Sequence, residues 1–511
     1  MKYLTLRNTA LLFSFMALAA CQDNSRFDAE IPFPTVKEEE EEDKEDEEMG
    51  TSSYNELYRP QIHYTPAKNW MNDPNGMVYA DGVYHLFYQY NPKGNDWGNM
   101  SWGHATSTNL IEWEEQTVAL ERDDLGDIFS GSAVYDAENT AGFGKGAIVA
   151  LYTSSGSHQQ QSMAYSTDGG KSFVRYDKNP IIANTSEADF RDPKVFWHKE
   201  TNQWIMALAK GWKYEIEFWG SVDLKNWTKL SAFSTPINAC NKGQWECPDL
   251  LRMNYQGKDK WVLIVSVNPG GPVSGSGTQY FIGDFDGTSF VADERNYPLW
   301  LDYGMDNYAG VTWSNVEDRQ ILIGWMNNWN YAGAVPVNPW RSAMTLPREL
   351  NLIEWNGNPI LASTVVKEID EIAGEWKDIT SESLGVSDAY QLKLELDITK
   401  KSTIVLKNTV GEYLEMSVNA ATRQLITHRT GKTGQYSFAG NFSIPSIKSP
   451  FNTDGDKVVL DIFVDRSSVE VFTENGSMVQ TNLVFPNGVY NQLIVEGQTV
   501  NGKVRELKSI W

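Results

Sequence analysis

From about Tyr58 onward, apolar positions occur in short runs that are rich in aromatic and β-branched residues. Clusters of Gly, Asn, Asp and Pro separate these runs, and such clusters are typical of turns between strands. The pattern therefore predicts an all-β protein.

One local pattern recurs in the first part of the chain: a small residue, a polar turn and then an aromatic residue. The closing aromatics are 60, 54 and 63 residues apart; they are Trp113, Phe173, Trp227 and Phe290. A repeat of this length is slightly longer than the ~40–50 residues of familiar four-stranded propeller blades. Residues 58–357 are therefore expected to hold about five such units, which form a five-bladed β-propeller.

The pattern changes again in the last part of the chain. Residues 389–398 alternate strictly between apolar and polar side chains, and residues 458–472 hold further strand around a turn at 465–468. Alternation of this kind is typical of a sheet with one solvated face. We therefore expect a C-terminal β-sandwich over residues 358–511, with a packing role.

The N-terminus has the features of an export signal. Lys2 and Arg7 precede an apolar run that ends in small residues, and this run is too short to span a bilayer. The sequence LAAC at 18–21 resembles a bacterial lipobox, after which Cys21 becomes the lipidated N-terminus. We expect a signal peptide over 1–20 and an exported, membrane-anchored lipoprotein on the cell surface or the periplasmic face. A simple cleaved signal with a fortuitous cysteine is the alternative.

Residues 21–57 are expected to form an acidic linker. Positions 38–48 read EEEEEDKEDEE, which is ten acids around one lysine. Such a block repels itself and cannot bury a core, so it is expected to be a solvated tether.

Composition narrows the range of partners. The 511 residues include 43 Lys and Arg against 67 Asp and Glu, a formal net charge of −24, which argues against a nucleic-acid partner. Only 6 His and 3 Cys leave little material for a metal centre, so we expect no metal and no cofactor. The 19 Trp suit a neutral polyhydroxy ligand, although a tryptophan is more often part of the core.

Polar residues recur with nearly the same period as the turns. Successive members are 57, 62, 54 and 62 residues apart; they are Asp73, Ser130, Asp192, Glu246 and Tyr308. If each unit starts next to a central channel, these side chains converge at one mouth of it. Three carboxylates there would supply the acid and the nucleophile or base that glycosidic hydrolysis requires.

Each of these acids also has a structural interpretation. The sequence NDPNG around Asp73 consists of residues that favour a turn. Asp192 could form an ion pair with Arg191 at a strand end, and Glu246 could be a hydrogen-bonding residue at the top of a blade. Their shared phase and the surrounding tryptophans favour a site.

Competing catalytic signals are weak. The GKS and GKT triplets lack the upstream glycine of a phosphate-binding loop, and neither a G-x-S-x-G elbow nor an H-E-x-x-H zinc motif is present. Cys240 and Cys247 could form a disulfide in an oxidising compartment, but a buried, small apolar role for Cys247 is favoured.

Several motifs together resemble glycoside hydrolase family 32, the β-fructofuranosidases. The resemblance covers roughly residues 58–511 in the family's order. The motifs are WMNDPNG, QYNP, FSGSAV, FRDPKVFW, WECPDLL, GWMNNWNY with NPWRS and LPREL, and FVDRSSVEVF. The resemblance implies a five-bladed propeller joined to a β-sandwich, which agrees with the repeat count.

The resemblance also implies residue roles. Asp73 would be the nucleophile, Glu246 the acid/base and Asp192 the transition-state stabiliser. The substrate-binding set would be Trp70, Asn72, Gln89, Trp97, Phe129, Ser130, Arg191 and Trp325. We expect Asp73 to be ionised, Glu246 to be protonated, and Arg191 to keep Asp192 charged. A retaining mechanism would need the carboxyls of Asp73 and Glu246 to be about 5–5.5 Å apart.

The sequence therefore predicts a retaining hydrolase that removes terminal fructose from a fructan, such as levan or inulin, and possibly from sucrose. An endo-acting levanase or inulinase is the nearest alternative. A non-catalytic fructan-binding lipoprotein and an inverting arabinan-type hydrolase are disfavoured, the first because all three acids are present and the second because of the EC motif and the sandwich.

Overall fold

The computed structural model describes residues 54–234 and 238–511. The predicted signal peptide, Cys21 and nearly all of the acidic linker lie outside these residues. The described chain is almost entirely β-structure, with three short 3-10 helices: η1 (Gly211–Lys213), η2 (Ala332–Ala334) and η3 (Lys367–Ile372). Among these residues, no helix combines the length and the apolar character needed to cross a membrane.

Five antiparallel sheets follow one another along the first two thirds of the chain. Their first strands are β1 (Asn69–Ala80), β5 (Asp127–Asp136), β9 (Arg191–His198), β13 (Gln244–Tyr255) and β18 (Tyr308–Thr312). Their second strands are β2 (Val83–Tyr90), β6 (Ala147–Ser155), β10 (Gln203–Lys210), β14 (Lys258–Asn268) and β19 (Gln320–Met326).

The third strands of these sheets are β3 (Ser101–Ser107), β7 (Gln159–Ser166), β11 (Glu215–Ser221), β15 (Gly277–Phe285) and β22 (Arg348–Trp355). The fourth strands are β4 (Glu114–Glu115), β8 (Val174–Arg175), β12 (Thr228–Ser234), β16 (Phe290–Ala292) and β23 (Asn358–Val365). Two short strands join at sheet margins, β17 (Leu299–Trp300) beside β15 and β21 (Ala343–Met344) beside β19. The fifth sheet extends past the predicted boundary at residue 357, because β22 and β23 form one hairpin.

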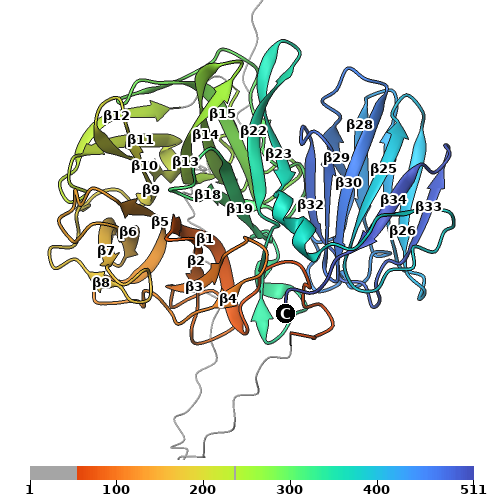
Figure 1. Ribbon diagram of the computed structural model, residues 1–511, viewed down its shortest axis with the longest axis horizontal. Helices are drawn as coiled ribbons and strands as arrows, with labels where there is room; N and C mark the ends of the chain where they lie inside the picture. The colour runs from red at the N-terminus through yellow and green to blue at the C-terminus, as the bar shows by residue number, and fades with distance from the viewer. Residues whose placement is uncertain (1–53, 235–237) are drawn as a thin grey trace, which may run out of the picture. The chain divides into compact units, whose positions relative to one another are not determined.

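The first strands of the five sheets lie together. β1 contacts β5, β5 contacts β9, β9 contacts β13, β13 contacts β18, and β18 contacts β1 again. Figure 1 shows these strands near a common centre, with the short β4 and β8 farther out. A later strand, β20 (Trp340–Arg341), pairs in parallel with β1. The ring of contacts brings residues that are far apart in the sequence to one place.

The recurring turn has a definite place in these sheets. In the first four sheets it joins the third strand to the fourth, so its aromatic residue stands next to or within the short outer strand. Trp113 lies just before β4, and Phe290 begins β16. The period of the repeat is therefore the length of one sheet with its connections.

The last part of the chain forms two further antiparallel sheets. One has the order β24 (Lys377–Asp378), β34 (Gly502–Glu506), β25 (Tyr390–Asp397), β30 (Lys457–Asp465), β31 (Ser468–Thr473) and β32 (Val479–Leu483). The other has the order β29 (Ile444–Pro450), β28 (Gln424–Arg429), β27 (Tyr413–Asn419), β26 (Ser402–Lys407) and β33 (Gln492–Glu496).

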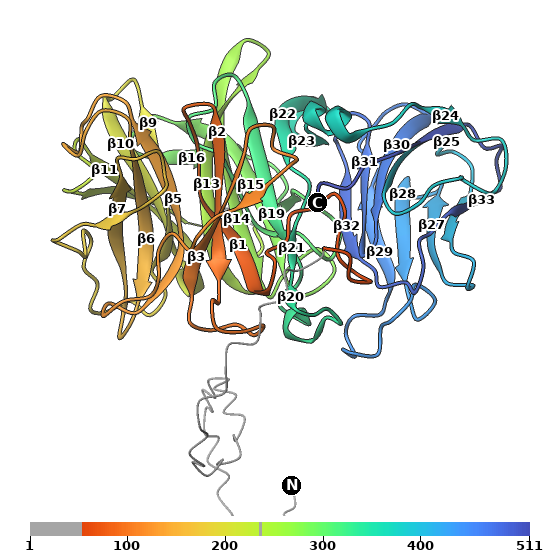
Figure 2. The same ribbon diagram turned by 60° about the horizontal axis from the view of Figure 1, so that its bottom comes forward.

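These two sheets share a core. Alternate residues of β25 and β26, such as Leu394 and Leu406, are buried in one apolar cluster, while the residues between them are less buried. Figure 2 shows the two sheets as two layers. The predicted turn at 465–468 joins β30 to β31. The alternating pattern of the sequence therefore corresponds to sheets with one face in a core.

A buried charged network connects this part to the rest of the chain. His63 lies 2.7 Å from Asp465 and 2.8 Å from Glu470, on β30 and β31. Arg348 of β22 bonds to Glu470 and, at 2.9 Å, to Asp302. The side chains of His63, Arg348, Asp465 and Glu470 are fully buried, so their charges depend on one another for compensation.

Candidate active site

A pocket of about 360 Å³ opens where the first strands begin. Its lining comprises Asn72, Asp73, Gln89, Trp97, Phe129, Ser130, Gln159, Asp189, Arg191, Asp192, Glu246 and Trp329. All three predicted acids are among these residues, together with six of the eight predicted substrate-binding residues. Asp73, Ser130, Asp192 and Glu246 come from four different sheets, each from the first strand.

Each of these first strands has an irregular register at its site residue. The pairing shifts between Met71 and Pro74 in β1 and between Ile128 and Gly131 in β5. Similar shifts occur at Asp192, Cys247 and Ala309, where φ is 64°, 47° and 53°. A β-bulge adds a residue to one strand and turns a side chain away from the sheet. The bulges therefore aim side chains of four neighbouring strands toward the pocket, and the bulge in β18 accompanies Tyr308, which reaches Glu246.

The carboxylate of Asp73 is held by hydrogen bonds at both oxygens. Asn72 Nδ2 donates to Oδ1 at 3.0 Å, and Ser130 Oγ donates to Oδ2 at 2.9 Å. Trp70 Nε1 in turn donates to Asn72 Oδ1 at 2.7 Å, which fixes the amide. These contacts orient Asp73 with its oxygens at the base of the pocket.

Asp192 lies close to the same group through Cys247. The backbone N–H of Cys247 donates to Asp192 Oδ2 at 2.9 Å. The Cys247 thiol lies 3.7 Å from Asp192 Oδ2 and 3.6 Å from Asp73 Oδ2. Burial raises the pKa of this thiol well above its ordinary value, so it remains protonated, and its single S–H lies within donating distance of either carboxylate.

Glu246 is held by two donors from neighbouring sheets. Arg191 donates to Oε1 through Nε at 3.1 Å and through Nη2 at 2.7 Å. The Tyr308 hydroxyl donates to Oε2. Burial, together with the charge of Glu246, raises the pKa of Tyr308 well above its ordinary value, so the phenol keeps its proton.

The pocket raises the pKa of two of the acids. Burial is the main cause at Asp73, and the negative charge of Glu246 adds to it, while the bonds from Asn72 and Ser130 oppose it. Burial also raises the pKa of Asp192 to about 7, although the Arg191 guanidinium acts in the opposite direction. Arg191 is 3.9 Å from Asp192 and makes its short contacts with Glu246 and Asp189 instead. Arg191 therefore favours the charged form of Asp192, as expected, but burial has the larger effect on the pKa of Asp192.

Comparison with known proteins identifies this arrangement. The model of the glycosyl hydrolases family 32 N-terminal domain matches residues 63–363, and that of the family 32 C terminal matches residues 364–510. The chain belongs to glycosyl hydrolase family 32. It is therefore a glycosidase.

The chain is similar to other members of family 32 over almost its whole described length. A levanase of Bacillus subtilis (strain 168) is 42% identical over 90% of this chain and 72% of its own length. An extracellular exo-inulinase of Aspergillus ficuum is 39% identical over 90% of this chain and 96% of its own length. The crystal structure of the exo-inulinase from Aspergillus awamori has a TM-score of 0.83 and 36% identity, covering 90% of this chain and 100% of that one.

Two of the substrate-binding residues that the family resemblance implied do not line the pocket of this family 32 protein. Trp70 and Trp325 are 1% and 0% exposed. Both pack against Trp329, with ring centroids 5.9 and 4.8 Å away, and Trp329 lines the pocket. Trp70 therefore reaches the pocket only through its hydrogen bond to Asn72, whereas Trp329 lines the pocket directly.

Gln159 and Asp189 also line the pocket, and sequence reasoning missed them. Arg191 Nη1 donates to Asp189 Oδ1 at 2.7 Å and to Gln159 Oε1 at 3.1 Å. Asp189 lies three residues before Asp192 and directly before the FRDP motif, which is a weak signal, whereas no pattern marks Gln159. Their contacts orient the guanidinium that holds Glu246.

The remaining expectations concern metals and disulfides. Within residues 54–234 and 238–511, no group of three or more His, Cys, Asp or Glu side chains is arranged to hold a metal ion. Cys240 and Cys247 are both free and buried. The favoured interpretation of Cys247 as a small buried residue thus agrees with the structure, and its thiol also contacts two of the acids.

Proposed function

We propose that this family 32 enzyme is a retaining fructosidase that releases terminal β-D-fructofuranosyl residues from levan, inulin or sucrose. The observation that carries the proposal is the convergence of Asp73, Asp192 and Glu246 in one pocket. Relatives named levanase and exo-inulinase support the substrate class.

In the proposed first step, Glu246 gives a proton to the glycosidic oxygen as Asp73 attacks C2 of the fructosyl unit. The bond from C2 to the leaving oxygen breaks, and a covalent fructosyl ester forms on Asp73. In the second step, Glu246 takes a proton from water, the water oxygen attacks C2, and Asp73 leaves as a carboxylate. Asp192 would accept hydrogen bonds from fructosyl hydroxyls and stabilise the positive charge that develops on the ring.

The surrounding groups suit these roles. Asn72 and Ser130 donate to the two oxygens of Asp73 and orient it for attack. Arg191 and Tyr308 hold Glu246 at the side of the pocket. Aromatic walls at Trp97, Phe129 and Trp329 are suited to the C–H faces of a sugar. The volume of about 360 Å³ favours a single terminal residue, which supports exo action.

Two variants test the catalytic roles. Asp73→Asn and Glu246→Gln remove the nucleophile and the proton donor with little change in volume. Each is expected to lower hydrolysis of inulin and levan by about 10³-fold or more, because a covalent or proton-transfer step loses its reacting group. Glu138→Gln, on the exposed surface, is the matched control and should hydrolyse like the wild type. Equal activity of all four proteins would overturn the site.

The product profile tests exo action and linkage. Levan and inulin are digested separately, and products are resolved at low conversion. Free fructose as the sole early product is expected. Early oligosaccharides would identify an endo-acting enzyme instead.

Proton NMR of the first product tests retention, since an inverting enzyme would release the opposite anomer.

We also propose that the five sheets are the blades of a propeller and that the two C-terminal sheets form a sandwich domain. The ring of contacts among first strands and the shared core of β25 and β26 support this. The hairpin of β22 and β23 supports a domain boundary after Val365 instead of after residue 357.

Export and a lipid anchor at Cys21 are proposed from the N-terminal sequence. The lipobox-like LAAC and the acidic tether support them. The exo-inulinase relative is named extracellular, in line with export. Labelling of cells with a radioactive fatty acid should mark the wild type and leave Cys21→Ala unlabelled. Equal labelling of both proteins would contradict the anchor.

A further inference from the structure

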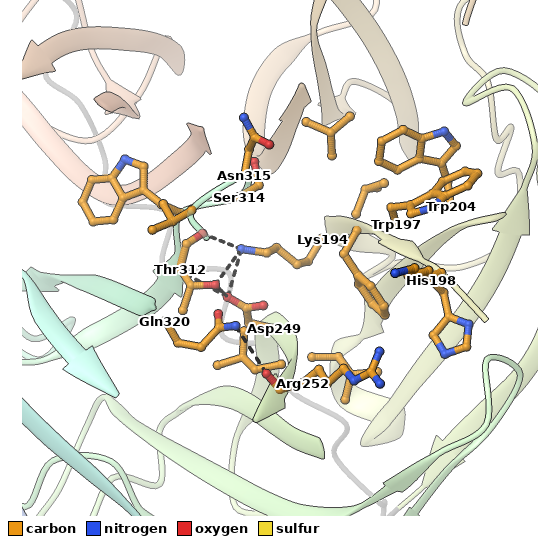
Figure 3. A pocket seen from close by; sticks show the side chains of 18 of the residues that line it. Lys194, Trp197, His198, Trp204, Asp249, Arg252, Thr312, Ser314, Asn315 and Gln320 are labelled. Carbon is orange, nitrogen blue, oxygen red and sulfur yellow. Dashed lines mark hydrogen bonds and ion pairs between the residues drawn. The ribbon is translucent and has the colours of Figure 1, made fainter. Parts of the chain in front are cut away.

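A second cavity, of about 330 Å³, lies farther along the same first strands. β9 carries Asp192 near its start and Lys194 and His198 farther on, and β13 carries Glu246 before Asp249. Figure 3 shows side chains from these strands around the cavity. None of the three acids of the active site lines it. The cavity is therefore a separate site on the strands that build the active site.

A buried ion pair forms one wall of this cavity. Lys194 Nζ lies 3.0 Å from Asp249 Oδ2 and donates to Thr312 O at 2.6 Å and to Thr312 Oγ1 at 3.2 Å. Thr312 also donates to Asp249 Oδ2 through its backbone N–H and its hydroxyl, both at 2.8 Å. The ion pair and both hydrogen bonds of the Asp249 carboxylate therefore involve the same oxygen, Oδ2.

The second oxygen of Asp249 has no partner. Among residues 54–234 and 238–511, no hydrogen-bond donor reaches Oδ1, although the side chain is completely buried. Figure 3 shows the carboxylate on the wall of the cavity, between Lys194 and Arg252. A buried acceptor without a partner is unfavourable by about 1–3 kcal/mol, so a donor from a bound molecule would stabilise this wall.

Aromatic side chains form another part of the lining. Trp197 is 39% exposed, and its ring meets Trp204 edge to face with centroids 5.0 Å apart. Trp204 and Trp313 are buried and also line the cavity. An exposed indole that is fixed by a second indole presents a flat apolar surface at low entropic cost.

Most of the charges around the cavity are compensated. Lys194 pairs with Asp249, and Arg252 pairs with Glu200 at 2.7 Å and with Asp259 at 2.6 Å. The exposed Lys199 also lines the cavity, and it has no ion-pair partner among the described residues. An ionic ligand that binds one of the paired groups would have to displace its partner. A neutral ligand with hydroxyl donors and an apolar face fits the wall groups without this cost.

We propose that this cavity binds a sugar residue of an oligosaccharide. One hydroxyl of the sugar donates to Asp249 Oδ1, and its C–H face packs on Trp197. The choice of a fructan as the ligand rests on the proposed function, whereas the recognition of a polyhydroxy ring rests on the cavity. Such a site would hold part of a long substrate away from the active-site pocket.

Calorimetric titration of the full chain with the trisaccharide 1-kestose tests the proposal. The chain carries Glu246→Gln so that the sugar is not hydrolysed, and two sites are expected. Adding Trp197→Ala should weaken one of them by about tenfold or more, because it removes the apolar surface under the sugar. Trp197→Phe retains an aromatic ring and should restore part of the affinity. Tyr436→Ala, which removes another exposed aromatic ring at 44% exposure, is the control and should keep both sites.

A crystal of the Glu246→Gln chain soaked in the same sugar should show density beside Asp249 and Trp197. One site per chain, or two unchanged sites after Trp197→Ala, would overturn the proposal, and ordered water alone in the cavity would do the same. Circular dichroism verifies that each variant is folded. Hydrolysis by the wild-type chain is measured separately, so a failure of the second site is distinguishable from a failure of the proposed function.

Discussion

The guanidinium of Arg191 donates two hydrogen bonds to Oε1 of Glu246, at 3.1 Å and 2.7 Å. The two residues come from adjacent first strands, β9 and β13. Arg191 is nevertheless next to Asp192 in the sequence, where an ion pair within the motif was the simpler expectation. The geometry makes Arg191 a positioning residue for Glu246 and a source of positive charge near Asp192.

Replacement of Arg191 is expected to change the pH dependence of activity. Arg191 opposes the effect of burial on Asp192, so Arg191→Gln should raise the pKa of Asp192 further. If Asp192 acts as a carboxylate, the acidic limb of kcat/KM then moves to higher pH. Loss of two hydrogen bonds to a charged group should also lower kcat/KM by about 100-fold.

The measurement is a pH profile of kcat/KM on sucrose. Arg122→Gln breaks an exposed ion pair with Asp127 and serves as the control, with an unchanged profile. An acidic limb of Arg191→Gln at the wild-type position would contradict the electrostatic role.

Tyr308→Phe tests the second donor to Glu246. The variant keeps the ring and removes only the hydroxyl, so Glu246 Oε2 loses its partner. We expect kcat/KM to fall by about tenfold or more, since leaving a partly buried acceptor without its donor costs about 1–3 kcal/mol. Steady-state kinetics measures this. Tyr79→Phe, whose ring packs on Tyr84, is the control, and an equal loss in it would indicate a nonspecific effect.

His63 predicts a stability that depends on pH. Its bonds to Asp465 and Glu470 outweigh the effect of burial and raise its pKa to about 9. Below its ordinary pKa of about 6.5 the imidazolium contributes its full stabilisation, which is lost as the pH rises through 9. The difference corresponds to about 3 kcal/mol. Arg348 and His63 lower the pKa of Glu470 to about 2, so the same contacts also weaken in strong acid.

Urea unfolding at a series of pH values measures this effect. The free energy of unfolding should fall between about pH 6.5 and 9, and His63→Gln should flatten this decline. His85→Gln is the matched control, because burial lowers the pKa of His85 to about 4 and keeps it neutral over this range. The idea fails if the wild type and His63→Gln decline in parallel.

Arg348→Met is expected to destabilise the protein strongly. Arg348 is fully buried and compensates both Asp302 and Glu470. Removing one member of a buried charged group leaves its partners uncompensated, which costs about 3–5 kcal/mol. Arg122→Met, at an exposed ion pair, should cost at most about 1 kcal/mol. Urea unfolding compares the two, and equal losses would refute the role of the network.

The local patterns of the sequence predicted much of the β-structure. The alternation at 389–398 corresponds to β25, and the turn at 465–468 joins β30 to β31. Such patterns are readable because a strand alternates its side chains between two faces. The repeated turns likewise mark one position in each of four successive sheets. Asp73, Asp192 and Glu246 were found because they share that period.

Contacts between distant segments could not be predicted from local sequence patterns. The burial of Trp70 and Trp325 behind Trp329 depends on how the first and fifth sheets meet. The partner of Arg191 depends on a bulge in β9 and on the position of β13 beside it. Oδ1 of Asp249 lacks a partner because Lys194 and Thr312, which come from two other sheets, both contact the other oxygen, Oδ2.

The sequence alone determined the strands, the period of the sheets and the three candidate acids, since these follow from local side-chain patterns and motifs. Only the tertiary structure decided which groups hold each acid, that burial raises the pKa of Asp73 and Asp192, and where a second cavity lies. The reason is physical. Hydrogen bonds, desolvation and cavities arise between segments that are distant in sequence, and no local pattern encodes their distances.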